Sequence, residues 1–468
     1  MERGMHMAIT RRQLIKRSGG LGLGIAFAGS VESLFGATAY AASSAEAYGY
    51  GPLIPDPAGI LDLPEGFTYT TFSRFRAPTA GGPLPTRHDG MSTFPGGDGR
   101  TRLVRNHEQA NDAVRVPAPP LFTYDPRSTG GTMTVELDDD LTVLSEYGSL
   151  GGTVRNCAGG RTPWGTWLSC EETELRQGAP GRGGPYTKDH GWVFEVDPEN
   201  NDNNVSPTPI VGMGRYAHEA VAIDPETNAA YLTEDAASPF GLLYRFTPVD
   251  AGGGYGSYRA GGELEAMYVQ EVRDLSTVTR VNTRLNHVEW VPVPDPTAFA
   301  VPTRSQFTDE QVTRSQKLEG AWFGRGAVYI VASFAREENG SAAYHDGQVW
   351  RYEPKNNSLT LELIFNNGGR FNAPDNITIS PFGGGVVLAE DSGDDQYLVG
   401  VAQNGRPFPI ARNALNTAEL AGVTFSDDGR TLFGNIYSGP PAGLTFAIRG
   451  PWDSLSPAAP GSNAGGES

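Results

Sequence analysis

Short clusters of acidic residues recur along the chain, and each lies next to a segment that resembles a β-strand. They are Asn106-His107-Glu108, Glu171-Glu172, His218-Glu219, Glu234-Asp235, Glu319, Asp375-Asn376 and Glu390-Asp391. Taken singly, such a cluster is usually an exposed acidic turn. If several of them converged, their carboxylates would repel one another unless cations lay between them. Carboxylate and amide oxygens are the ligands of hard cations, so the clusters together predict a calcium site.

Cys157 lies in a glycine-rich segment that ends in Glu171 and Glu172. A thiolate beside carboxylates indicates a transition metal, because sulfur is a soft ligand. The only other cysteine is Cys170, and an even number of cysteines also fits a disulfide in an oxidising compartment. From the residues alone, Cys157 is therefore a metal ligand, half of a disulfide or a buried thiol.

The elements that would position these residues form an internal repeat. Strand-like segments rich in aromatic and branched residues recur at 132–137, 191–198, 241–248, 347–354, 396–401 and 444–449. Four of the five spacings between their first residues lie between 48 and 59, and the fifth is 106. Between these segments, alternating strands flank Gly, Asp or Pro turns at 220–234, 376–390 and 422–434, which is the pattern of a β-hairpin.

Repeats of about 40 to 50 residues with four short strands each are typical of propeller blades. The six copies predict an all-β, six-bladed β-propeller with loop and short-helix insertions, formed by residues 42–453 as one domain. Residues 250–316 are expected to be an insertion or an atypical blade. A β-sandwich with long loops is the alternative, but it does not explain why the hairpin returns at a near-fixed interval. Loops converge at the mouth of a propeller channel, so this fold would bring the acidic clusters together.

Residues 1–41 have the composition of a targeting segment. Arg11 and Arg12 precede an apolar, glycine-rich run at 21–29, and small residues at 39–42 offer a cleavage site. This pattern predicts a signal peptide, and the paired arginines indicate the twin-arginine pathway. The apolar run is shorter than the about 20 residues that a membrane span requires. We therefore expect export by the twin-arginine machinery, to the periplasm or the medium, without stable insertion in a membrane.

The net charge of the chain is −18, and removal of a basic signal peptide makes it more negative. Such a surface does not attract nucleic acid or anionic lipid, so no nucleic-acid partner is expected. Propellers of this size are commonly monomers, and we expect a monomer here. Residues 454–468, rich in Pro, Ala, Gly and Ser, are expected to be disordered.

The segment from Asn156 to Glu172 resembles the signature of PhoX-type alkaline phosphatases. It reads Asn-Cys-Ala-Gly-Gly-x-Thr-Pro-Trp-Gly-Thr-x-x-x-Cys-Glu-Glu. Further matching pieces follow the family order: Gly90-Met91, Arg105 to Glu108, Gly214 to Glu219, Glu319-Gly320-Ala321, Pro374-Asp375-Asn376 and Glu390-Asp391. The resemblance extends over nearly the whole chain after the signal peptide. It implies a six-bladed propeller that hydrolyses phosphate monoesters with a cluster of Ca²⁺ and Fe³⁺ in its channel.

The resemblance also implies roles for individual residues. Cys157 would bind iron, and the carboxylates that would bind the metals are Glu172, Glu219, Glu319, Asp375, Glu390 and Glu108. Cys170 would be unpaired. We expect Glu219, Glu319 and Lys317 to act in catalysis.

Lys317 stands where the family carries an arginine that clamps phosphate. Lysine keeps the positive charge but lacks the bidentate fork of arginine, so phosphate affinity or substrate range is expected to differ. Arg215 and Arg161 are further candidates for contacts with substrate, or for structural ion pairs. Two other functions remain open: a calcium-only propeller that hydrolyses lactones or phosphotriesters, and a metal-braced scaffold without activity.

Overall fold

The computed structural model describes residues 49–366, 368–382, 385–402, 404–438 and 443–455. The predicted signal peptide and residues 456–468 of the predicted tail lie outside these ranges. Within them the chain forms β-strands and short 3-10 helices, and no α-helix. None of the described helices has the length and apolar character needed to cross a membrane.

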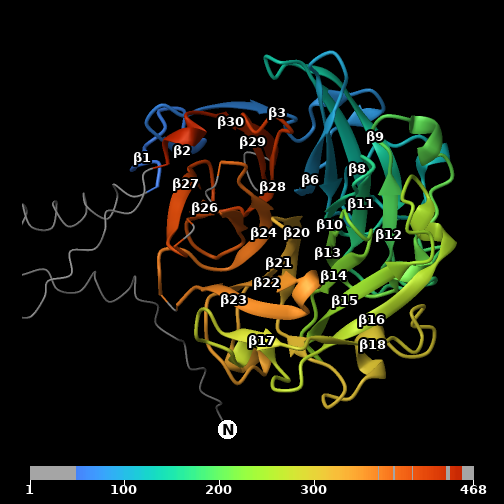
Figure 1. The fold of residues 1–468 in the computed structure, drawn as a ribbon. Helices are drawn as coiled ribbons and strands as arrows, with labels where there is room; N and C mark the ends of the chain where they lie inside the picture. Colours follow the sequence, from blue (N-terminus) through green and yellow to red (C-terminus); the bar gives the residue numbers. More distant parts are fainter. Residues whose placement is uncertain (1–48, 367, 383–384, 403, 439–442, 456–468) are drawn as a thin grey trace, which may run out of the picture. The chain divides into compact units, whose positions relative to one another are not determined.

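Six antiparallel sheets form the blades of a β-propeller, as the repeat predicted. In chain order, their innermost strands are β6 (His88–Pro95), β10 (Asn156–Arg161), β13 (His218–Ile223), β20 (Leu318–Gly324), β24 (Pro374–Ile379) and β28 (Leu420–Phe425). Each innermost strand lies against the next one, and β28 lies against β6, so the ring is closed. Figure 1 shows these six strands around the centre of the ring.

The second and third strands explain the period of the sequence. The second strands are β7 (Thr101–His107), β11 (Trp167–Glu171), β14 (Ala230–Glu234), β21 (Ala327–Ala332), β25 (Val386–Glu390) and β29 (Thr431–Ile436). The third strands are β8 (Gly130–Leu137), β12 (Val193–Val196), β15 (Gly241–Pro248), β22 (Gln348–Glu353), β26 (Tyr397–Val401) and β30 (Leu444–Arg449). Each repeated segment of the sequence is a third strand, and the three predicted hairpins are β13–β14, β24–β25 and β28–β29.

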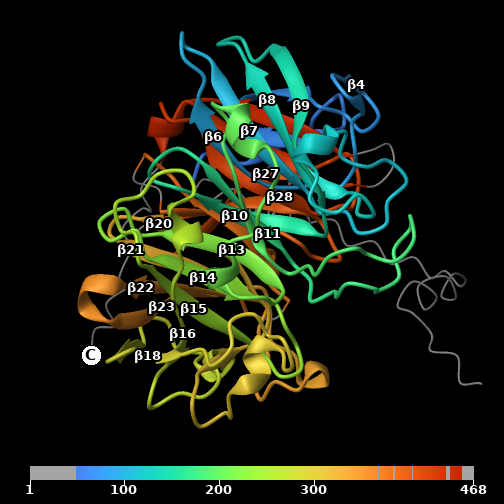
Figure 2. The same ribbon diagram turned by 90° about the vertical axis from the view of Figure 1, so that its right-hand side faces the viewer.

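The outer strands vary more. The fourth strands of blades one, three, four and five are β9 (Val143–Thr153), β16 (Gly262–Tyr268), β23 (Ser358–Ile364) and β27 (Pro407–Asn413). Figure 2 shows β8 and β9 side by side, at the top of that view. Residues 250–316 account for the long interval in the repeat and add strands to two blades. β16 and β18 (Glu289–Pro292) extend blade three, whereas β17 (Arg284–Asn286) pairs with β23 of blade four.

The N-terminal strands complete the last two blades. β3 (Thr68–Phe72) pairs with β30 and is the fourth strand of blade six. β2 (Leu61–Pro64) pairs with β27, and β1 (Leu53–Ile54) pairs with β2, which widens blade five. The ring is therefore closed by strands from both ends of the described chain.

The apolar core is divided among the interfaces between neighbouring blades. Tyr231 of blade three packs in one cluster with Trp350 of blade four, and Phe94 and Trp167 pack between blades one and two. Burial of apolar surface is the main favourable term in folding, so each blade is held from both sides. The innermost strands are thereby fixed, and residues at their ends have defined positions.

Candidate metal centre

The innermost strands share a local irregularity near their first residues. The pairing of β6 with β7 shifts by one residue between His88 and Met91, and equivalent shifts occur at the starts of β10, β13, β20 and β24. A β-bulge of this kind redirects a side chain. The first bulged residues are Asp89, Cys157, Glu219, Glu319 and Asp375. In blade six the shift comes one residue later, and the equivalent position is Ala421.

A second set of side chains follows the ends of the second strands. These residues are Glu108, Glu172, Asp235, Ser333, Asp391 and Tyr437. In each blade, the backbone N–H of this residue donates a hydrogen bond to the carbonyl oxygen of the residue two positions before the bulged one, at 2.8–3.2 Å. In blade order, the accepting residues are Arg87, Arg155, Ala217, Lys317, Ala373 and Glu419. The same hydrogen bond in all six blades brings both sets to one end of the channel.

The structure brings the potential ligands together in three groups. Within each group, the ligand atoms lie within 4.8 Å of one another: Cys157, Glu172 and Glu219; Glu219, Glu319 and Asp375; Asp375, Asp391 and Glu419. The groups share Glu219 and Asp375, so they form a continuous run from blade two to blade six. The first group combines sulfur and oxygen donors, which suits a transition metal. The other two offer only oxygen, which suits calcium.

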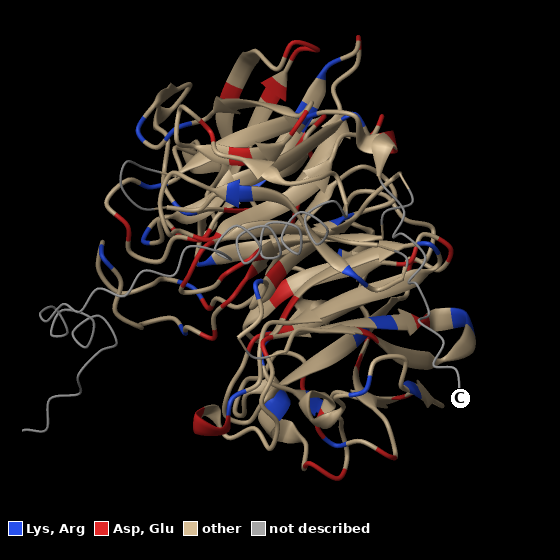
Figure 3. Cartoon of the chain, turned by 90° about the vertical axis from the view of Figure 1, so that its left-hand side faces the viewer, with Lys and Arg blue, Asp and Glu red and all other residues tan. Residues whose placement is uncertain are grey.

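Burial and mutual repulsion disfavour the ionised form of carboxyl groups in this run and of Asp89, which interacts with them. Burial, followed by the charges of neighbouring carboxylates, raises the pKa of Asp89, Glu219 and Asp375 well above the usual range. Burial likewise raises the pKa of Glu319 to about 7, although Lys317 opposes the shift. Segments of Asp and Glu lie close to one another near the centre of Figure 3. Bound cations would relieve this repulsion, so the donor set fits a group of metal ions.

Cys157 is buried, and its Sγ lies 3.3 Å from the carbonyl oxygen of His218. Burial, followed by the charges of Glu219 and Glu172, raises the pKa of its thiol. Metal coordination requires the thiolate, and a bound metal ion stabilises that form. Cys157 and Cys170 are both free, so no disulfide joins them.

Glu390 lies one residue from the run. Its carboxylate accepts hydrogen bonds from the backbone N–H groups of Asn372, at 2.8 Å, and Tyr397, at 3.0 Å. Glu171, at the equivalent end of β11, holds backbone N–H groups in the same way. Among the described residues, Glu390 belongs to none of the three groups, whereas the next residue, Asp391, does.

Glu108 lies at the edge of the run. It accepts a hydrogen bond from the hydroxyl of Tyr437, and Arg87 Nη1 is 4.0 Å from its Oε2. Burial raises the pKa of Glu108 to about 7. It is outside the three groups of described residues, but its charge helps to raise the pKa of Asp89 and of Glu172.

Lys317 is part of the centre. Its Nζ lies 2.9 Å from Asp235 Oδ2 and 3.0 Å from Glu319 Oε1. The charge of Glu319, and then that of Asp235, raises the pKa of Lys317, which favours the ammonium form of the side chain.

The structure places Arg215 and Arg161 elsewhere. Arg215 is buried and donates to the backbone carbonyl oxygens of Glu174, at 3.0 Å, and of Thr297, at 3.3 Å. Arg161 ends β10, whereas Cys157 lies at its start, and its guanidinium pairs with Asp427 and lies 5.2 Å from the Phe94 ring. Both side chains have structural partners away from the three groups.

Two carboxylates of the centre, Asp89 and Glu419, are absent from the acidic clusters of the sequence, and two others, Asp235 and Asp391, belong to those clusters but were not expected as individual ligands. Asp89 has a recognisable signal, because an acidic residue followed by a small and an apolar one occurs at Asp89, Glu219 and Glu319 alike. Glu419 has no such signal, since its blade carries Ala421 at the bulge position and supplies the acid two residues earlier.

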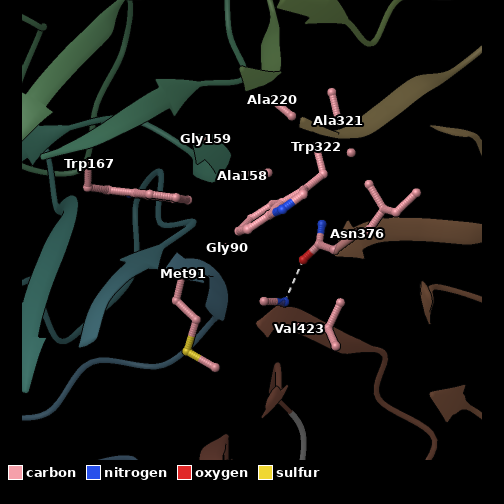
Figure 4. A pocket seen from close by; sticks show the side chains of 13 residues that line it. Gly90, Met91, Ala158, Gly159, Trp167, Ala220, Ala321, Trp322, Asn376 and Val423 are labelled. Carbon is pink, nitrogen blue, oxygen red and sulfur yellow. Dashed lines mark hydrogen bonds between the residues drawn. The ribbon is translucent and has the colours of Figure 1, made fainter. Parts of the chain in front are cut away.

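Beyond the bulges the channel narrows. Gly90, Ala158, Ala220 and Asn376 line a space of about 20 Å³, which holds roughly one water. Figure 4 shows the ring of Trp322 lying across this section, and the side-chain oxygen of Asn376 accepting the hydrogen bond of a backbone N–H.

Comparison with known proteins gives a family and a fold. The sequence model of the family described as "Alkaline phosphatase PhoX" matches residues 48–145 and 128–440. The structure of Pseudomonas fluorescens PhoX in complex with vanadate, a transition state analogue, superposes with a TM-score of 0.64 at 16% identity, covering 86% of this chain and 98% of that one. A gluconolactonase from Xanthomonas campestris gives a TM-score of 0.42 at 12% identity, with coverages of 86% and 98%. No curated protein matches the chain.

Proposed function

The chain belongs to the alkaline phosphatase PhoX family, and from this premise we propose that it hydrolyses phosphate monoesters at a calcium and iron centre in the channel. The observation that carries the proposal is the run of three donor groups across the mouth, one with sulfur and two with oxygen only. A mouth of bare carboxylates would repel a dianionic ester, whereas bound cations would reverse the local field.

The donors divide between the two metals by their chemistry. We assign iron to Cys157, Glu172 and Glu219, and calcium to the groups that contain Asp375. Glu219 and Asp375 each belong to two groups and would serve ions on both sides. When bound, the ions supply positive charge to the phosphoryl oxygens and Lewis acidity for hydrolysis.

Lys317 is the residue of the chain that we assign to the phosphoryl group. An ammonium has three N–H donors, and Asp235 and Glu319 accept two of them. The third is available to a phosphoryl oxygen of the substrate. The two carboxylates also fix the direction of the ammonium, so that it stabilises charge without rearrangement during the reaction.

The proposal is tested with two cysteine variants. In protein purified after native folding, elemental analysis should find iron and calcium, and p-nitrophenyl phosphate should be hydrolysed at alkaline pH. Cys157→Ala should lose iron and reduce turnover by more than about 100-fold, because a direct ligand is removed. Cys170→Ala is the matched control, since Cys170 is equally buried but lies outside the three groups, and it should keep both.

Calcium without iron in the wild-type protein, or metal ions without turnover of phosphate monoesters, would contradict the proposal. Those results would favour a calcium-dependent hydrolase of other esters or a scaffold without activity.

We further infer that the protein is a monomer exported through the twin-arginine pathway to the periplasm or the medium. Arg11→Lys combined with Arg12→Lys keeps the charge but removes the arginine pair. The double variant should accumulate uncleaved in the cytoplasm, as measured by cell fractionation and mass spectrometry of the N-terminus. Arg17→Lys, outside the pair, should be exported normally, and export of the double variant would refute the assignment.

A further inference from the structure

Four innermost strands begin from a left-handed backbone conformation. Arg87, Arg155, Lys317 and Ala373 have φ of 57°, 50°, 45° and 44°, and each lies two residues before a bulged residue. Glycine suits this region, whereas other residues are strained in it. Three of these four positions nevertheless carry long cationic side chains. Strained backbone of this kind clusters at functional sites, which directs attention to the three cationic side chains.

Arg87 and Arg155 occupy equivalent positions on neighbouring blades. Their carbonyl oxygens accept the backbone N–H groups of Glu108 and Glu172, respectively. Arg87 Nη1 lies 4.0 Å from Glu108 Oε2, and Arg155 Nη1 lies 3.8 Å from Glu172 Oε2. Burial raises the pKa of Glu108, and the charges of the two arginines oppose that shift. The pair therefore lies on the side of the mouth next to the donor group of Cys157.

Arg155 is the less constrained of the two. Among the described residues its one ion pair joins Nη1 to Glu172 Oε2 at 3.8 Å, and its side chain is 51% exposed. Arg87 is held by Asp112, at 3.0 Å, and by the Tyr437 hydroxyl, at 2.9 Å. A guanidinium has five N–H donors, so Arg155 keeps donors for a ligand, in contrast to the buried Arg215.

We propose that Arg155, supported by Arg87, binds a second anionic group on the alcohol part of the substrate. The inference rests on the proposed phosphatase function and adds a substrate class to it: monoesters whose leaving group carries a carboxylate or a further phosphate. Lys317 lies two blades from Arg155 and is tied to Glu319 inside the donor groups. The reacting phosphoryl group is thus placed with Lys317, and the leaving group with the arginines. Arginine binds both carboxylate and phosphate in a bidentate manner.

Two esters that differ at one group test the subsite. 3-Phosphoglycerate carries a carboxylate where glycerol 3-phosphate carries a hydroxymethyl group. Wild-type kcat/KM should favour 3-phosphoglycerate by about 10-fold, as charged hydrogen bonds of this kind predict. Arg155→Gly removes the guanidinium and relieves the left-handed backbone. It should bring the ratio of kcat/KM for the two esters to about 1, with the change carried by KM for 3-phosphoglycerate.

Arg325→Gly is the matched control. Arg325 also has a left-handed backbone, with φ of 51°, but it lies in the turn between β20 and β21, at the far end of those strands from Glu319. This variant should keep the wild-type preference. The same proteins assayed with fructose 1,6-bisphosphate and fructose 6-phosphate show whether the subsite also accepts phosphate.

Loss of the preference in either pair of esters supports the subsite and identifies its anion. The subsite is overturned, while the phosphatase function stands, if Arg155→Gly keeps the wild-type preference in both pairs. It is also overturned if the variant loses kcat/KM equally on all four esters. If the wild-type protein hydrolyses p-nitrophenyl phosphate but none of the four esters, the subsite fails while the phosphatase function stands; if it hydrolyses none of the five, both fail. Thermal unfolding of Arg155→Gly shows that the variant is folded.

Discussion

Lys317 is held between two carboxylates at a position where the family resemblance implies an arginine. Lys317→Arg would restore a bidentate fork for the phosphoryl oxygens. We expect KM for p-nitrophenyl phosphate to fall by about 3- to 10-fold, in line with the strength of charged hydrogen bonds. Steady-state kinetics with elemental analysis measures this effect. Lys355→Arg, an exposed lysine paired with Glu226, is the control, and an unchanged KM at full metal content would show that position 317 does not contact phosphate.

The choice between adjacent residues was the hardest part of the site to predict. The sequence marks Glu390 and Asp391 as one acidic pair, but only the fold shows that Glu390 binds backbone N–H groups while Asp391 joins the donor groups. Side chains alternate along a strand, so an error of one residue changes the surroundings completely. Arg215 raised a different difficulty, because its carbonyl partner Thr297 is distant in the sequence. The cysteine and the glutamates at the bulges were easier, since each lies in a motif that resembles the family signature, although the sequence predicted no strand at Cys157 or Glu319.

Among the elements, the close contact between the starts of β20 and β24 is the most sensitive. A Cβ atom at Gly320 would lie 2.6 Å from the carbonyl oxygen of Asp375 and 3.0 Å from the Cα of Asn376. Gly320→Ala must therefore displace the backbone next to Glu319 and Asp375. We expect calcium content to fall and turnover to drop by about 100-fold, the effect of misplacing a reactive group by roughly 1 Å.

Gly393→Ala is the control for this variant, because a Cβ at Gly393 meets no atom within 4 Å. Elemental analysis measures the calcium content of both variants, and steady-state kinetics measures their turnover. Full metal content in Gly320→Ala would show that the bulged strands tolerate movement.

The strands themselves were largely predictable, whereas their irregularities were not. Segments such as 241–248 combine alternation with aromatic residues, and β15 has these bounds. A bulge depends on the register between two strands, and this register cannot be predicted from the composition of one strand alone. The placement of Cys157 and Glu219 side by side therefore became visible only with the pairing of β10 and β13 with their neighbours.

The stability of the molecule as a whole should depend on pH without metals and should lose this dependence when metals are bound. Burial raises the pKa of Glu319 and Glu108 to about 7 in the folded protein, against about 4.3 for an unperturbed glutamate. Between these values the folded state binds more protons than the unfolded state, so its free energy of unfolding falls as pH rises. The melting temperature of the metal-free protein should thus decrease from about pH 4 to about pH 8.

Metal-loaded protein should not show this decrease, because its carboxylates are ionised by coordination. Differential scanning fluorimetry with and without a chelator measures both curves. Glu319→Gln should flatten the curve of the metal-free protein. Greater stability of the metal-free protein in alkaline than in mildly acidic buffer would contradict the charge balance described for the mouth.

At this scale the repeat predicted the six blades, but not how the ring closes. Pairing of β3 with β30 joins residues 68–72 to residues 444–449, and nothing in the local pattern of either segment specifies the other. The same applies to β17, which leaves the segment 250–316 to pair with blade four. Long-range pairing of this kind depends on the complete fold. The sheet of blade six has an unpaired edge at β30 until the N-terminal strand β3 pairs with it.

This closure has a consequence for the order of synthesis. The strand that completes blade six is made early, but it has no partner until β30, at residues 444–449, has left the ribosome. The three donor groups draw on blades two to six and end at Glu419. The centre is therefore assembled only after translation of the last blade, and a chain that stops early lacks both the final ligands and the closed ring.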